Sequence, residues 1–167
     1  ELESAIGELL KQHGHTITTA ESCTGGWLAR RITNVSGSSG WFRAGFVTYA
    51  NEAKSAHLGI DEDLLEKHGA VSREVALAMA RGVRDLDNAD VSVAITGIAG
   101  PTGGTEEKPV GTVYIAVIGA DAKEHCHHFH FMGDRERIRF QSTQSALDMV
   151  RLSYSGEELD SGYIVRG

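Results

Sequence analysis

Two stretches of the sequence are apolar and rich in β-branched residues along their whole length, VSVAIT at residues 91–96 and GTVYIAVIG at residues 111–119. Such runs are typical of strands that are buried on both faces of a sheet. Helical patterns lie before and after them in the chain, so helices are available to cover both faces. We therefore expect an α/β fold, a three-layer α/β/α sandwich around a mixed, mostly parallel sheet of about five strands.

Capping residues and shorter runs predict the other elements. Further strands are expected at residues 16–20, 45–50 and 124–131. Helix ends are indicated by Gly14, Thr33, Asn51, Gly59, Asp61, Gly69, Ser72, Asp134 and Leu152. The helix capped by Ser72 should bury Val75, Met79, Val83 and Leu86. A tight turn at residues 119–121 joins the last two strands in a hairpin, so the fourth strand should run against the others.

Ligands of open α/β sheets gather at the carboxyl ends of the parallel strands. Three unusual loops fall on that edge: AESCTGG after the first strand, TYANEAK after the second, and residues 96–112 after the third. The last of these loops contains five glycines and two prolines. We therefore expect a functional site where these three loops meet.

Ser22 is a candidate nucleophile in the first loop. It precedes a predicted helix whose first backbone N–H groups are unpaired, and Gly25 and Gly26 let a ligand approach them. Donors of this kind stabilise an oxyanion. No histidine lies in the three loops, but a desolvated Lys54 can accept the serine proton, either directly or through the hydroxyl of Tyr49.

Each of these residues also has a simpler interpretation. Lys54 is equally consistent with a surface lysine of a helix, and Tyr49 with an aromatic residue that packs on the core. Cys23 is an alternative nucleophile, because a helix N-terminus lowers a thiol pKa, although a buried structural thiol is commoner. Glu21 is either a base or a partner of the helix dipole.

Four histidines in the segment EHCHHFH suggest a metal site at first sight. On a strand, His128 and His130 would share one face and His125 and His127 the other. No carboxylate or cysteine motif completes a ligand set on either face. We expect no metal and no cofactor.

Charge and cysteine content exclude several classes of protein. The net charge of −7 opposes a general nucleic-acid surface. There is no signal-peptide pattern, and no run approaches the ~20 apolar residues of a membrane span. The two cysteines, Cys23 and Cys126, lie in elements that are not expected to pack together, so no disulfide is expected. This favours a reducing, cytoplasmic setting.

Six motifs, in order and at consistent spacing, resemble the CinA C-terminal domain family. They are TAESCTGG, GSS at residues 37–39, VTYANEAK, HGAVS at residues 68–72, TGIAGPTGGTEEKPVGTV and GDRERIR at residues 133–139. The resemblance runs from about Leu2 to Leu152, and we expect residues 1–152 to form one amidohydrolase domain of the CinA C-terminal type. Residues 153–167 lose periodicity and are expected to form a loosely ordered tail.

The resemblance implies a nicotinamide mononucleotide deamidase of the stand-alone bacterial type. Such an enzyme produces nicotinic acid mononucleotide and ammonia for the salvage of pyridine nucleotides (NAD). It also implies a Ser-Tyr-Lys site at Ser22, Tyr49 and Lys54. Substrate would be bound by the remaining candidate residues, Thr24, Gly25, Gly26, Thr96, Gly97, Arg135 and Arg139. Arg135 would hold the phosphate, and we expect a homo-oligomer, with a dimer favoured.

Two other functions compete with this one. Short-chain dehydrogenases also use Ser, Tyr and Lys, but they place three residues between Tyr and Lys where this chain has four, and the dinucleotide fingerprint G-x-G-x-x-G is absent after the first strand. A relative that binds a pyridine nucleotide without hydrolysing it is the second alternative. Release of ammonia from nicotinamide mononucleotide separates it from a deamidase.

Overall fold

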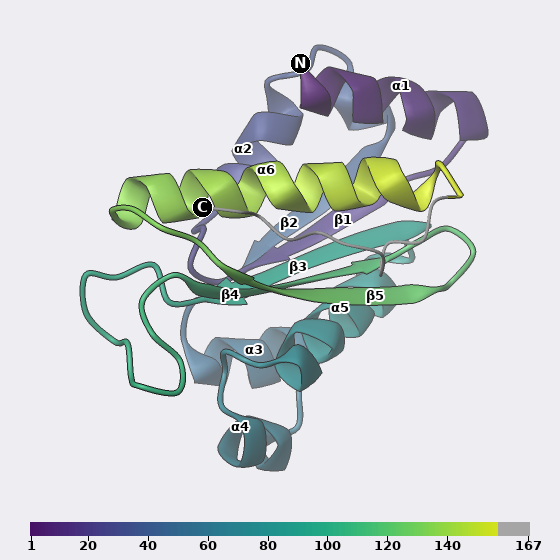
Figure 1. Cartoon of the computed structure of the whole chain (residues 1–167). Coiled ribbons are helices and arrows are strands. Elements are labelled where there is room, and N and C mark those ends of the chain that lie inside the picture. The colour runs from purple at the N-terminus through teal and green to yellow at the C-terminus, as the bar shows by residue number, and fades with distance from the viewer. Residues whose placement is uncertain (157–167) are drawn as a thin grey trace.

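The computed structural model describes residues 1–156, and it has three layers (Figure 1). Helices α1, α2 and α6 cover one face of a central sheet, and α3, α4 and α5 cover the other. The strands are β1 (Ile17–Glu21), β2 (Phe42–Val47), β3 (Val91–Gly97), β4 (Thr112–Ile118) and β5 (Glu124–His130). The α-helices are α1 (Leu2–His13), α2 (Trp27–Thr33), α3 (Asn51–Leu58), α4 (Glu62–His68), α5 (Arg73–Asp87) and α6 (Arg135–Ser153).

The sheet has the strand order β2-β1-β3-β4-β5. Strand β1 pairs in parallel with both β2 and β3, whereas β4 is antiparallel to both of its neighbours. Strand β4 therefore runs against the other four. This confirms the predicted α/β sandwich with a mixed, mostly parallel sheet.

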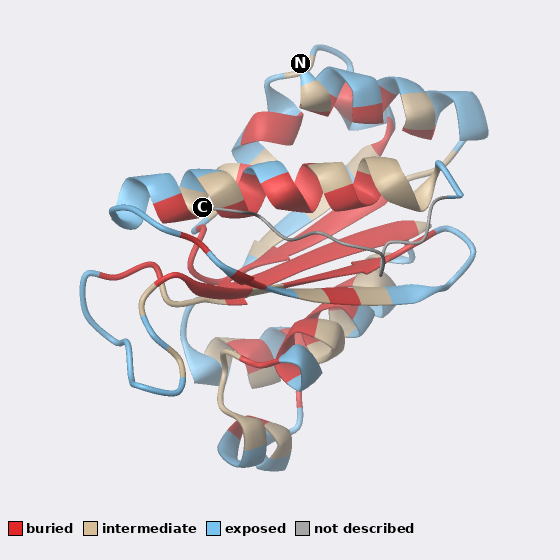
Figure 2. Ribbon diagram, in the orientation of Figure 1, coloured by how far each residue is buried: buried red, intermediate tan, exposed pale blue. Residues whose placement is uncertain are grey.

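Both faces of the central strands are buried, as the continuous apolar runs predicted (Figure 2). Val93 and Ile95 of β3 pack in the core under α1 and α6. Ala94, which lies between them, belongs to the second core, where Met79 and Val83 of α5 pack. Burying one such aliphatic side chain stabilises a fold by about 1.5–3 kcal/mol. The larger residues Val93 and Ile95 therefore face the helix layer of α1 and α6, and the small Ala94 faces the layer of α5.

Three details differ from the predictions. The second strand runs from Phe42 to Val47 rather than over residues 45–50, because its pairing with β1 starts at Phe42 and ends at Val47, opposite Glu21. Asn51 is the first residue of α3 and makes no capping bond; the N-cap is Ala50. Leu86 is 56% exposed, because it lies in the last turn of α5 beyond the packed stripe that ends at Val83.

The C-terminal segment was expected to be loosely ordered from residue 153. Ser153 is instead the last residue of α6. The hydroxyl of Tyr154 lies 2.9 Å from Nδ1 of His15, so the first residues after the helix are held against the end of α1. The expectation for residues 157–167 lies outside the described residues.

Strand register brings the three candidate loops together. Glu21, the last residue of β1, is paired with Val47 on one side and with Ile95 on the other. Just beyond these pairs, the backbone N–H of Ser22 donates to the carbonyl of Ile95, and the N–H of Thr48 donates to that of Glu21. The loops that start at Ser22, at Thr48 and after β3 therefore leave the sheet side by side.

A candidate active site at the carboxyl edge of the sheet

A buried lysine contacts the predicted nucleophile. Nζ of Lys54 lies 3.2 Å from Oγ of Ser22, and it also lies 2.9 Å from the carbonyl oxygen of Thr48 and 3.3 Å from that of Tyr49. Lys54 occupies the first turn of α3, where it is only 1% exposed. The short segment between β2 and α3 thus folds back so that its own carbonyl groups bind the lysine.

Burial lowers the pKa of Lys54 below its ordinary value. A neutral amine has two N–H bonds and one lone pair. The carbonyl groups of Thr48 and Tyr49 can accept those two N–H bonds, which leaves the lone pair for the hydroxyl proton of Ser22. The arrangement suits direct proton transfer from Ser22 to Lys54.

Cys23 is buried beside the serine, and its thiol is not activated. Burial, the larger cause, and the negative charge of Glu21 together raise the pKa of this thiol to about 12. A thiol with such a pKa is protonated at neutral pH and is a poor nucleophile. Of the two adjacent candidates, Ser22 therefore has the better environment for attack.

Glu21 is a partner of the α2 helix rather than a base facing the site. Its carboxylate is 1% exposed and accepts hydrogen bonds from the backbone N–H groups of Gly26, Leu28 and Ala29. The sequence predicted that the first N–H groups of this helix would be free near Ser22. That prediction was wrong for these three groups, because the preceding carboxylate folds back onto them.

The turn after Ser22 requires glycine at two positions. Gly25 and Gly26 both have positive φ angles, 59° and 91°, in the left-handed region that other residues rarely adopt. A Cβ atom at Gly25 would also lie 3.1 Å from Nη2 of Arg139. Glycine therefore lets the turn reverse direction while Arg139 packs against it and donates to the carbonyl of Thr24 at 2.9 Å.

The phenol of Tyr49 points to a different partner from the one predicted. It is 57% exposed, and its hydroxyl accepts a hydrogen bond of 2.8 Å from Nη2 of Arg135. Only the backbone carbonyl of Tyr49 contacts Lys54. Nη1 of Arg135 donates to the carbonyl of Gly100 at 2.8 Å, so this arginine links the second and third loops.

Thr96 and Gly97 lie at the end of β3, below the third loop. Thr96 is buried, and its hydroxyl donates to the carbonyl of Ala70 at 2.8 Å. A Cβ atom at Gly97 would lie 2.9 Å from the carbonyl oxygen of Thr112. Thr96 thus ties the end of β3 to the segment between α4 and α5, and Gly97 lies where a side chain would not fit.

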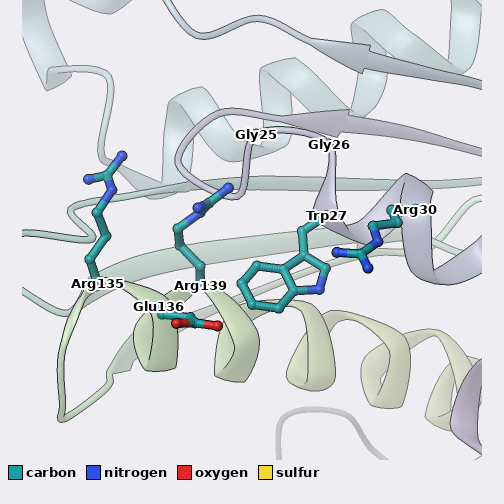
Figure 3. A pocket seen from close by; sticks show the side chains of 7 residues that line it. All are labelled: Gly25, Gly26, Trp27, Arg30, Arg135, Glu136 and Arg139. Carbon is teal, nitrogen blue, oxygen red and sulfur yellow. The ribbon is translucent and has the colours of Figure 1, made fainter.

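A pocket of about 510 Å³ lies between the glycine turn and the start of α6 (Figure 3). It is lined by Gly25, Gly26, Trp27, Arg30, Arg135, Glu136 and Arg139. The guanidinium of Arg139 lies 5.4 Å from the centre of the Trp27 ring. Three arginines and one glutamate give the lining a net charge of +2, which complements a small anionic group.

Sequence reasoning missed Arg30 and Trp27 as pocket residues. Both lie in the first turns of α2, directly after the glycine turn. Their position one helical turn apart, next to a predicted ligand loop, is the signal that could have indicated them. Without the packing of α6 against α2, however, the sequence does not show that a pocket forms there.

The histidine-rich strand forms no metal centre in residues 1–156, where no group of three or more His, Cys, Asp or Glu side chains is arranged to hold a metal ion. His128 stacks on Tyr114 of the neighbouring strand, with ring centres 4.6 Å apart.

Among the helices of residues 1–156, none has the length and apolar character that a membrane span requires.

Comparisons with known proteins agree with this architecture. The chain is 51% identical over 150 residues to the nicotinamide-nucleotide amidohydrolase PncC of Escherichia coli K12, an alignment that covers 90% of this chain and 91% of PncC. It is 54% identical over 153 residues to a CinA-like protein of Koribacter versatilis, but it spans only 36% of that protein's length.

A solved structure has the same fold. The competence/damage inducible protein CihA from Agrobacterium tumefaciens superposes with a TM-score of 0.89 at 40% identity, covering 92% of this chain and 93% of that one. The family model of the CinA C-terminal domain matches residues 1–154. The chain therefore belongs to the CinA C-terminal domain family.

Proposed function

We propose that this protein hydrolyses the carboxamide of nicotinamide mononucleotide, giving nicotinic acid mononucleotide and ammonia. The observation that carries the proposal is the contact between the buried amine of Lys54 and the hydroxyl of Ser22, 3.2 Å apart. The relative PncC, a nicotinamide-nucleotide amidohydrolase, supports the choice of substrate.

In the first step, neutral Lys54 accepts the hydroxyl proton of Ser22 while Oγ attacks the carbonyl carbon of the carboxamide. The tetrahedral intermediate collapses when Lys54 returns the proton to the amide nitrogen, which leaves as ammonia. A water molecule then attacks the acyl-serine while Lys54 takes one of its protons; when the bond to Ser22 breaks, Lys54 returns this proton to Oγ, and the carboxylic acid is released. Atoms and protons balance with no group beyond the chain, the substrate and water.

The arginine pocket would bind the phosphate of the substrate. A phosphate dianion matches the net charge of its lining, and Arg30, Arg135 and Arg139 line it with guanidinium groups, which can bind phosphate through two parallel hydrogen bonds. Tyr49 would hold Arg135 at the boundary between this pocket and Ser22.

We further propose that the enzyme acts in the cytoplasm, in pyridine nucleotide salvage, as a homodimer. Two buried free cysteines, Cys23 and Cys126, are compatible with a reducing compartment. Light scattering of the purified protein measures the assembly directly: a mass of two chains supports the dimer, and a mass of one chain contradicts it.

The test of the proposed function is product analysis. Purified protein incubated with nicotinamide mononucleotide should release ammonia and nicotinic acid mononucleotide in equal amounts, and the Ser22→Ala variant should release neither. Calorimetry with the same compound provides the second arm. Binding without ammonia release would identify a nucleotide-binding relative, and the deamidase proposal would be wrong.

A further inference from the structure

The carboxylate of Glu21 replaces a missing helix cap immediately before the nucleophile. Helix α2 has Gly26 at its N-cap position and therefore no capping side chain of its own. Glu21 accepts from the N–H groups of Gly26 at 3.1 Å, Leu28 at 3.0 Å and Ala29 at 2.9 Å. Because Glu21 is the last residue of β1, these bonds clamp both ends of the turn that contains Ser22.

This clamp determines which backbone donors remain near the serine. The N–H of Gly25 donates to the carbonyl of Ser22, and that of Trp27 donates to the carbonyl of Thr24. With the next donors bound to Glu21, the N–H groups of Cys23 and Thr24 are the ones in the turn that reach no oxygen acceptor within residues 1–156. They directly follow Ser22 in the chain.

We propose that Glu21 is a positioning residue that holds the turn so that Ser22 and the N–H group of Cys23 face the substrate carbonyl together. This N–H group would stabilise the oxyanion that forms when Ser22 attacks, whereas Thr24 is fully buried. The inference rests on the proposed function, since it takes Ser22 as the nucleophile. It assigns the oxyanion to the turn rather than to the N-terminus of α2, whose donors the carboxylate already occupies.

A role in stability alone is the alternative, and another capping carboxylate provides the control. Asp61 caps α4, accepting from the N–H of Asp63 at 3.0 Å, and it lies on an exposed helix outside the site. Removal of either carboxylate should destabilise the fold. Only removal of Glu21 should change the chemical step.

The test compares Glu21→Gln, Glu21→Asp and Asp61→Asn with the unaltered enzyme. Glutamine places an N–H₂ group against backbone donors, and aspartate is one methylene too short to reach them. We expect kcat for nicotinamide mononucleotide to fall roughly 10- to 100-fold in both Glu21 variants, somewhat less than loss of a whole oxyanion donor. KM should stay within about threefold, because the arginines are untouched.

In Asp61→Asn, Tm should fall while kcat per folded molecule stays unchanged. If the Glu21 variants also kept kcat per folded molecule within about twofold, Glu21 would be a cap only and the positioning role would be wrong.

A second measurement uses the unaltered protein and needs no activity. Amide hydrogen exchange followed by NMR should show protection at Gly26, Leu28 and Ala29 and faster exchange at Cys23. Fast exchange at the first three would overturn the clamp even if the variants fail to fold. A protein that shows this exchange pattern but releases no ammonia would instead contradict the proposed function.

Discussion

Arg135 donates a hydrogen bond to the phenol of Tyr49, although the two residues lie 86 positions apart in the chain. The same guanidinium binds the carbonyl of Gly100, so one side chain at the start of α6 joins two loops of the site. The contact places the phenol beside the arginine pocket, whereas the amine of Lys54 lies 3.2 Å from Oγ of Ser22.

Tyr49→Phe distinguishes a phenol that holds Arg135 in place from a phenol that relays the proton of Ser22. We expect KM for nicotinamide mononucleotide to rise about 2- to 10-fold, because the loss of one hydrogen bond to a charged group loosens Arg135. The value of kcat should stay within about threefold. If the phenol instead relayed the serine proton, kcat would fall by a factor of 100 or more, and steady-state kinetics at saturating substrate would detect it.

Arg135→Ala should reduce kcat/KM for nicotinamide mononucleotide by roughly 10- to 150-fold. A charge-assisted hydrogen bond to phosphate contributes about 1.5–3 kcal/mol, and this range converts to that factor. Hydrolysis of nicotinamide riboside, which has no phosphate, should barely change. Equal losses on both compounds would show that Arg135 supports the fold or the chemistry instead of binding the phosphate.

Arg30→Ala tests the side of the pocket that α2 forms, opposite Arg135 on α6. The side chain of Arg30 is exposed and makes no hydrogen bond or ion pair within residues 1–156, so its removal should leave Tm within a few degrees. We expect KM for the nucleotide to rise several-fold and inhibition by inorganic phosphate to weaken. Lys67→Ala, which removes one positive charge from an exposed position of α4 on the opposite face of the sheet, is the matched control. Similar changes in both variants would indicate a general effect of net charge.

The activity should rise with pH in a way that reports Lys54. Burial lowers the pKa of this amine, and the neutral form is the base, so kcat/KM should increase as the pH passes upward through that lowered pKa. Lys54→Arg, whose guanidinium stays protonated, should lose nearly all activity across the range. A profile that falls with rising pH over the same interval would mean that the protonated amine is required.

Much of the fold could be predicted because its signals are local. The apolar runs of β3 and β4 indicated buried strands, and Asp61, Ser72 and Asp134 each cap the predicted helix. The bounds of β2 were harder to predict from the sequence, because they depend on where its pairing with β1 stops. Leu86 continues the periodic stripe of α5, but its exposure depends on where the sheet ends beneath that helix.

Parts of the candidate site could be predicted from residue type and strand order, whereas contacts between distant elements could not. Ser22 and Lys54 could be singled out by residue type and by their position on one edge of the sheet. The attachment of Tyr49 to Arg135 and the walls of the pocket depend on how α6 packs beside α2. The contacts of Glu21 depend on a reversal of the chain that the sequence indicated only through its two glycines.

The most direct test of the central claim is the rate of nicotinamide mononucleotide hydrolysis by Ser22→Ala and Cys23→Ala beside the unaltered protein. Ser22→Ala should lose nearly all activity and keep its Tm within a few degrees. Cys23→Ala should retain most activity, because its thiol, with a pKa of about 12, is buried and protonated. Retained activity in Ser22→Ala together with its loss in Cys23→Ala would assign the attack to the thiol and contradict the Ser22–Lys54 mechanism.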